Sequence, residues 1–337
     1  MSAADIDLFG QPLPAAAAAR ARAEDAAPAA ARPLLGWPEA LSHDRRARLH
    51  LGTSSWSFPG WAGLVYAARA PESTLSRHGL EAYSRHPLLG AVGIDRGFYA
   101  PLEPAQYAAY ARQVPEAFRF VVKAPGLVTD ASVREARGAP VAPNPHHLDA
   151  AAAVDAFVAP CTEGLGARAG VLVFQFSPLP REWLADAAGW IARLGGFLRA
   201  LPAGPRYAVE VRDAALVTPR LVHTLRDAGA LYCVGVHDRM PPVERQLRAV
   251  EAYEAGRAAP LVARWSLRRG LGYEEARRRY APFTRLVDED VATRGALADK
   301  AAATLDAGQP VFVTANNKAE GSAPLTLARL AEAIAAR

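Results

Sequence analysis

Three charged side chains lie at the ends of apolar runs, where burial would change their chemistry. Lys123 ends the run FRFVVKA (residues 118–124), and Glu210 and Arg212 end the run RYAVEVR (206–212). A desolvated lysine has a lowered pKa and can act as a base or a Schiff-base nucleophile. Glu210 and Arg212 are two positions apart, so on a strand they share a face and could combine a carboxylate with an anion-binding guanidinium. The structural alternatives are an ion pair of Lys123 with Glu210 or Asp95, and a mutual polar plug of Glu210 and Arg212.

These runs belong to a series of eight that alternates with helical patterns. They span residues 49–55, 89–99, 118–124, 169–176, 206–212, 230–237, 260–266 and 310–317. Short apolar runs bounded by breakers are typical of buried parallel strands. Helical spacing marks residues 104–114, 181–201, 218–229 and 294–308. No Gly-x-Gly-x-x-Gly follows the first run, so the pattern favours a closed, TIM-type (β/α)8 barrel over an open doubly wound sheet.

The barrel is expected to occupy residues 49–337 as a single domain. Residues 1–48 are rich in Ala, Pro and Arg, which predicts a disordered N-terminal tail. The connection over residues 125–168 is long and Pro-rich, and it could overhang the mouth of the barrel.

In such a barrel the chemistry lies at the C-terminal ends of the strands. Lys123 and Glu210 are the acid/base candidates, Arg212 and Arg264 could bind an anion, and Trp56 could stack on a ligand. The candidates for ligand binding are Ser54, Trp56, Asp95, Tyr99, Gln175, Arg212, Asp238, Arg264, Asn316 and Asn317. The alternatives are that the aromatic residues pack on the barrel and that the asparagines cap a turn.

A metal site is a further possibility at these strand ends. His237 and Asp238 could bind an ion together with Glu210 and Asp95, as in metal-dependent sugar isomerases. A lone His-Asp pair is more often part of a satisfied turn. The sequence therefore assigns no metal ligand, and it identifies no cofactor.

Five motifs, GTSSWSFPGW, FRFVVKAP, VLVFQFSPLP, AVEVRD and VFVTANN, follow one another along the chain. In this order they resemble the YecE-like domain-of-unknown-function family, number 72, over about Leu49 to Ile334. The resemblance implies a TIM-type barrel that has been likened to sugar isomerases, without an established reaction. Gly93 stands where that family has an acid, and Asp213 and Ser266 stand where it has histidines. Acid/base roles at those positions therefore do not transfer to this chain.

Composition narrows the classes of function. No apolar run reaches 18 residues, which excludes a membrane-spanning helix, and the two cysteines make no disulfide framework. The net charge of +5 is too small to predict nucleic-acid binding by itself. The tail has acidic residues and lacks the apolar core of a secretory signal, so we expect a cytoplasmic protein.

The sequence thus predicts a protein that binds or transforms a small polyhydroxylated or anionic ligand, with isomerase- or lyase-like chemistry by fold analogy. One alternative is a non-catalytic binding barrel that has lost the acid/base residues of the family. Another is an accessory of nucleic-acid processing, suggested by mild basicity and by DIDLF (Asp5–Phe9). That segment resembles peptides that dock on bacterial sliding clamps, minus the initial Gln, although five-residue matches often arise by chance.

Overall fold

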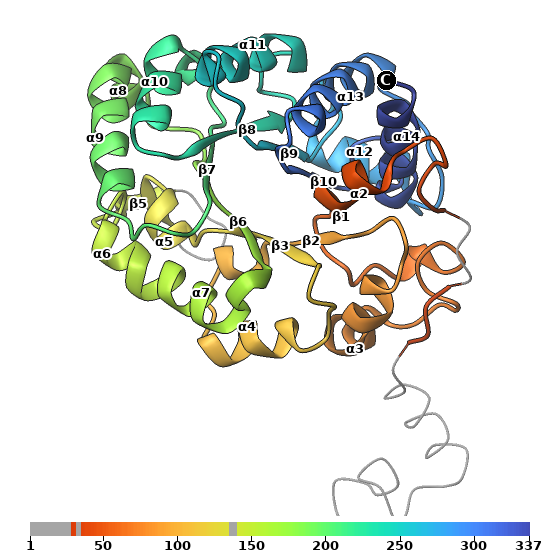
Figure 1. Cartoon of the computed structure of the whole chain (residues 1–337). Helices are drawn as coiled ribbons and strands as arrows, with labels where there is room; N and C mark the ends of the chain where they lie inside the picture. The colour runs from red at the N-terminus through yellow and green to blue at the C-terminus, as the bar shows by residue number, and fades with distance from the viewer. Residues whose placement is uncertain (1–27, 32–34, 135–139) are drawn as a thin grey trace, which may run out of the picture.

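Eight parallel strands close into a barrel at the centre of the molecule (Figure 1). The computed structural model describes residues 28–31, 35–134 and 140–337. The strands follow one another around the barrel in the order β1-β10-β9-β8-β7-β6-β3-β2. Their bounds are β1 (Leu49–Thr53), β2 (Ala91–Ile94), β3 (Arg119–Lys123), β6 (Ala169–Gln175), β7 (Tyr207–Glu210), β8 (Leu231–Val236), β9 (Leu261–Trp265) and β10 (Val311–Ala315). Each lies within one of the eight apolar runs, which confirms the predicted TIM-type barrel.

Helices form an outer ring around the strands (Figure 1). The main ones are α3 (Glu72–Ser84), α4 (Pro104–Ala111), α7 (Ala159–Leu165), α9 (Ala187–Arg199), α10 (Pro219–Asp227), α11 (Val243–Glu254), α13 (Val291–Asp306) and α14 (Ala323–Ala335). The segment 181–201, expected as one helix, is divided into α8 (Arg181–Ala185) and α9. Asp186 lies between them and accepts a hydrogen bond from the amide of Gly189, so it acts as the N-cap that starts α9. No helix in the described part of the chain is long and apolar enough to span a membrane.

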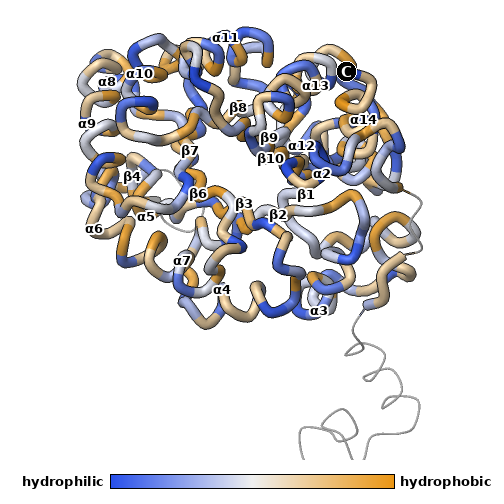
Figure 2. The backbone as a smooth tube through the Cα atoms, in the orientation of Figure 1, coloured by the Kyte–Doolittle hydropathy of each residue, from blue (hydrophilic) through white to orange (hydrophobic). Residues whose placement is uncertain are grey.

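The strand side chains separate into two apolar groups because successive residues point to opposite faces. One group faces the helices and joins their apolar sides, which appear as orange stretches of the tube in Figure 2. The other fills the barrel interior and includes Val121, Val173 and Val262. Lys123 and Arg264 lie two positions further along β3 and β9. The alternation therefore aims their side chains into the barrel, above an apolar layer.

The long connection between β3 and β6 is partly structured. It contains α5 (Gly126–Thr129), the hairpin β4 (Ser132–Arg134) and β5 (Pro140–Pro143), α6 (Ala150–Ala153) and a π-helical turn (Val154–Val158) ahead of α7. His147 attaches it to α9 because Trp190 Nε1 donates to His147 Nε2 at 3.1 Å. Burial lowers the pKa of His147 to about 4, so the ring is neutral and can accept this bond. Ser177, just after β6, donates to Asp130 Oδ1 at 2.6 Å, which holds the connection at the C-terminal side of the barrel.

Ordered segments precede Leu49, where the sequence predicted a tail. Residues 1–27 and 32–34, including the clamp-like segment Asp5–Phe9, lie outside the described residues. Among the described ones, α2 (His43–Arg48) leads directly into β1. Leu41 is buried, and the amide of Ala31 donates to the carbonyl of Val65 at 2.9 Å. These segments therefore pack on the barrel.

Candidate functional site

A cavity of about 190 Å³ lies at the C-terminal ends of the strands. Seven residues selected from the sequence line it, and they come from seven of the eight strand ends. They are Ser54, Asp95, Lys123, Gln175, Arg212, Arg264 and Asn316. Strand alternation brings them together, because each follows the interior-facing positions of its strand by an even number of residues. The position of the cavity is that of active sites in TIM-type barrels.

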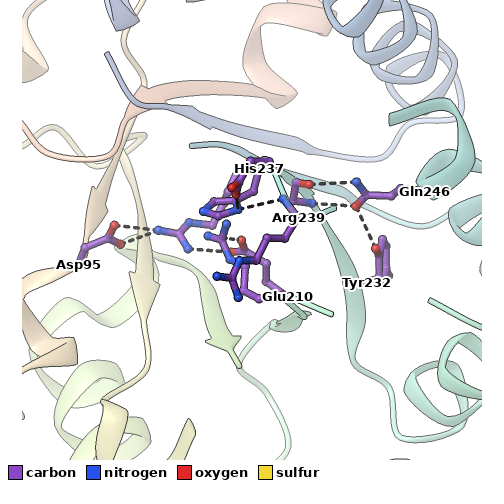
Figure 3. Close-up of polar contacts among 10 residues, drawn as sticks. Asp95, Glu210, Tyr232, His237, Arg239 and Gln246 are labelled. Carbon is purple, nitrogen blue, oxygen red and sulfur yellow. Dashed lines mark hydrogen bonds and ion pairs between the residues drawn. The ribbon is translucent and has the colours of Figure 1, made fainter. Parts of the chain in front are cut away.

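Arg264 is the centre of the charged network at the bottom of this cavity. Its Nη1 donates to Glu210 Oε2 at 2.7 Å, and its Nη2 donates to both oxygens of Asp95 at 2.9 and 2.8 Å. Figure 3 shows Asp95 and Glu210 approaching the network from opposite sides. One guanidinium on β9 thus connects the ends of β2 and β7 across the barrel, which requires its closed geometry.

Glu210 is fully buried and is ion-paired at both carboxylate oxygens. Its second oxygen, Oε1, lies 2.6 Å from Arg212 Nη2. Burial by itself would raise the pKa of Glu210, but Arg212 and Arg264 outweigh it and hold the pKa below its ordinary value. A Cβ at Gly235 on the neighbouring strand would lie 3.2 Å from Glu210 Oε1, so glycine leaves room for the carboxylate. Glu210 is therefore an ionised anchor for two arginines.

Arg212 presents an unused donor. Its side chain is only 10% exposed, and its Nη1 is buried without a hydrogen-bond partner among the described residues. A buried donor without a partner is unfavourable by about 1–3 kcal/mol. Other atoms of the same side chain line the cavity, since Arg212 is part of its wall.

Lys123 does not form the ion pair considered from the sequence. Arg264 binds Glu210 and Asp95, the two carboxylates expected to pair with Lys123. Lys123 Nζ lies 3.5 Å from the centre of the Phe98 ring. Burial, reinforced by the charge of Arg264, lowers the pKa of Lys123 to about 8, while Asp95 and Glu210 oppose this shift. The amine is thus a cation at neutral pH that loses its proton readily.

Uncharged polar groups complete the lining. Asn316 Nδ2 donates to Ser54 Oγ at 2.8 Å, which leaves the Ser54 hydroxyl free to donate to a ligand. The Gln175 side chain lines the cavity and is largely buried, and no hydrogen bond joins its amide group to another described residue. Both groups could orient a hydroxyl or carbonyl oxygen.

The comparisons with known proteins agree with this architecture. Residues 50–337 match the family described as "Protein of unknown function DUF72". The chain belongs to this family. The motifs read from the sequence therefore identified it correctly. No curated protein matches the chain.

Two solved DUF72 structures are similar to this chain. The DUF72 protein of Enterococcus faecalis is 17% identical with a TM-score of 0.55, and the match covers 85% of this chain and 95% of that one. The DUF72 protein of Thermotoga maritima is 16% identical with a TM-score of 0.53, and the match covers 86% and 99%. At such identities the likeness shows the fold alone.

Not every candidate faces the cavity of this DUF72 barrel. Tyr99 is 83% exposed and lies outside the lining. Asn317 Oδ1 accepts from Trp61 Nε1 and from the amide of Ala323, so it caps the turn before α14. Trp56 is buried, with its Nε1 donating to the carbonyl of Leu75, and its contacts are those of packing.

His237 and Asp238 contact each other, and His237 alone lines the cavity. Burial, followed by the charge of Arg212, lowers the pKa of His237, so the ring is neutral at neutral pH. Over residues 28–31, 35–134 and 140–337, no three His, Cys, Asp or Glu side chains are grouped to hold a metal ion. The four ligands considered from the sequence therefore do not converge on one site.

Thr314 and Tyr273 are lining residues with hydroxyl groups that escaped the sequence analysis. Thr314 precedes Asn316 by two positions on the strand, so the same alternation would have identified it. Tyr273, at the start of α12 (Tyr273–Tyr280), reaches the cavity from a loop after β9, and Lys318 Nζ lies 4.1 Å from its ring centre. Loops have no fixed period, so no signal in the sequence marked Tyr273.

Proposed function

We propose that this DUF72 barrel binds, and acts on, a small anionic ligand with hydroxyl or carbonyl groups in the cavity at the strand ends. The observation that carries the proposal is the charge of the site. Lys123, Arg212 and Arg264 face only two carboxylates, Asp95 and Glu210, and Arg264 occupies both of these. The positive charge of Lys123 and the free donor of Arg212 remain for a ligand. An anion would neutralise the first and satisfy the second.

Lys123 is the residue proposed to act on the ligand. With a pKa of about 8, about a tenth of the amine is neutral at pH 7, which suits a general base or a nucleophile toward a carbonyl carbon. Gln175, Ser54 and Asn316 would orient the oxygen atoms of the ligand. Isomerase- or lyase-like chemistry fits these roles.

Glu210 was the second acid/base candidate from the sequence. In this proposal it is a positioning residue, because its ion pairs with Arg212 and Arg264 keep it ionised and oriented. Proton transfer is assigned to Lys123 alone.

Calorimetric titration with glycolate and inorganic phosphate tests the binding step. We expect Lys123→Met and Arg212→Gln each to weaken binding about tenfold or more, because hydrogen bonds to charged groups are lost. Arg220→Gln removes an exposed positive charge on α10 and serves as the matched control. Equal affinities in all four proteins would refute the proposed site.

A second experiment addresses the chemical step. Glyoxylate combines a carboxylate with an aldehyde, and a Schiff base with Lys123 would be trapped by borohydride and located by peptide mass spectrometry. The chain has two other lysines, Lys300 and Lys318. Lys300 pairs with Glu254 and lies outside the cavity lining, so it is the internal control for non-selective reaction. Lys318 lies against Tyr273 of the lining and shows whether a second amine near the cavity reacts. An adduct confined to Lys123 supports the reactive amine.

The non-catalytic alternative also has an observation in its favour. Both carboxylates of the network are occupied by Arg264, so neither is free to act as a base. Binding of glycolate without any selective adduct at Lys123 would favour a barrel that only binds its ligand.

A further inference from the structure

A second cavity of about 130 Å³ adjoins the first. Ser54 and Asp95 line both cavities and form the boundary between them. The second one lies between the loop after β1, the end of β2 and the first turns of α3. At about 30 Å³ per molecule of liquid water, the first cavity has room for about six water molecules and the second for about four. The first cavity therefore suits a small anionic group, and the second has room for an extension of it.

Four of the nine residues that line the second cavity are serines. Ser54, Ser55, Ser57 and Ser76 all line it. Ser55 and Ser57 hydrogen-bond to each other at 3.3 Å, whereas no hydrogen bond joins the Ser76 hydroxyl to another described residue. A hydroxyl both donates and accepts, so such a wall matches the hydroxyl groups of a polyol better than a second charged group.

The remaining lining combines Trp56, Gly93 and Ile94 with the charged residues Asp95 and Arg96. Trp56 lines the cavity and is held by two hydrogen bonds. Its Nε1 donates to the carbonyl of Leu75, and its backbone carbonyl accepts from the Tyr66 hydroxyl. Gly93 lies at the base, where a Cβ would come within 2.9 Å of the Ser54 carbonyl oxygen. Any side chain at position 93 would therefore displace the loop that carries the serines. Trp56 is 6% exposed, so it adds a small apolar contact beside the hydroxyl groups, a combination suited to the CH and OH groups of a sugar-like chain.

The charges orient a ligand across the two cavities. Asp95 lies at their boundary, and Lys123 and Arg212 lie in the first cavity only. Arg96 lines the second cavity, where its Nη1 donates to the Tyr110 hydroxyl at 2.8 Å. An anionic group is attracted to the side of Lys123 and Arg212, while the part that passes Asp95 must be neutral or a hydrogen-bond donor. A hydroxyl group meets this requirement at Asp95, and its oxygen can also accept a hydrogen bond from Arg96.

We propose that the serine-lined cavity is a subsite for the polyhydroxylated part of the ligand, so that the natural ligand is an anion with a polyol chain. This inference rests on the proposed function, because it takes the anion-binding cavity as the place of the charged group. Ser55, Ser57 and Ser76 are its specificity residues, and the charged group is a carboxylate or a phosphate.

Two pairs of probes, each sharing a charged group, test the subsite. Glycolate and gluconate both carry a carboxylate, inorganic phosphate and sorbitol 6-phosphate both carry phosphate, and only the second of each pair has a polyol chain. We expect the longer probe to bind at least tenfold more tightly in calorimetric titration. The pair with the larger ratio identifies the charged group.

The variants are Ser55→Ala/Ser57→Ala and Ser76→Leu, with Ser73→Ala as the control on an exposed part of the same helix. We expect the affinity for the longer probe to fall about fivefold for each hydroxyl removed. Ser76→Leu fills the cavity and should reduce the longer probe to the affinity of the shorter one. Ser73→Ala should change nothing, and near-UV circular dichroism verifies the fold of each variant.

The outcomes separate the two proposals. If glycolate and phosphate bind but the longer probes bind no more tightly, the subsite is refuted and the anion site stands. If the longer probes are preferred and the serine variants keep that preference, the subsite is also refuted. If none of the anions binds, both the proposed function and the subsite fail.

Discussion

Glu210 and Asp95 bind the same arginine but should differ in their effect on stability when their charge is removed. Glu210 is fully buried and holds two guanidinium groups, whereas the Asp95 side chain is 38% exposed and holds one. Glu210→Gln leaves Arg212 buried without a counter-ion, and breaking a buried ion pair in this way costs about 3–5 kcal/mol. Asp95→Asn leaves Arg264 paired with Glu210, and a pair this exposed contributes about 1 kcal/mol or less.

Urea unfolding monitored by both fluorescence and circular dichroism measures this difference. We expect the midpoint of Glu210→Gln to fall several times further than that of Asp95→Asn, at an unchanged dependence on urea. The two side chains retain nearly the same shape in both substitutions, so the comparison reports charge and burial. An equal loss in the two variants, or a larger loss for Asp95→Asn, would refute the account of Glu210 as the buried anchor.

Three further expectations concern single residues. The pKa of Lys123 falls to about 8 in the folded protein, so the unfolded chain binds more protons between about pH 8 and pH 10. The free energy of unfolding should therefore rise with pH over that window. In urea titrations at several pH values, Lys123→Met should show no such rise and should be more stable than the wild type at pH 7. Gly235→Ala places a Cβ 3.2 Å from Glu210 Oε1. It should lower the free energy of unfolding by about 1–3 kcal/mol and weaken the binding of glycolate. An unchanged affinity would show that the carboxylate has room to move. The pKa of His147 is lowered to about 4, so the stability that the neutral ring contributes should be lost as the pH falls from about 6.5 to 4. His147→Gln should make the melting temperature less sensitive to acid. A melting temperature with the same pH dependence in variant and wild type would contradict the role of the neutral ring.

The sequence predicted the barrel and most of the cavity lining because both depend on short-range periodicity. Eight apolar runs correspond to the eight strands. The period of two along a strand, combined with the polar residue at its end, was enough to place Lys123, Gln175 and Arg264 in the cavity. The family followed from motifs that occupy the same strand ends.

Loop residues were predicted less well. Tyr99 and Asn317 lie only a few residues beyond their strands, yet one is exposed and the other caps a turn. Trp56, expected to stack on a ligand, packs edge-on against Tyr110 and lines the second cavity in place of the first. Beyond the last residue of a strand the backbone has no fixed period, so the direction of a side chain depends on contacts that are remote in the sequence.

Local patterns along the chain were thus sufficient for the parallel barrel, its family and most of the interior-facing polar residues. The pairing among those residues came from the closed geometry. Arg264 on β9 contacts Glu210 on β7 and Asp95 after β2, and these residues are 54 and 169 positions away from it in the chain. Such distances are bridged only when strand register and barrel closure bring the three ends to one point. The same closure leaves Lys123 without a carboxylate partner, because the guanidinium of Arg264 reaches both acids.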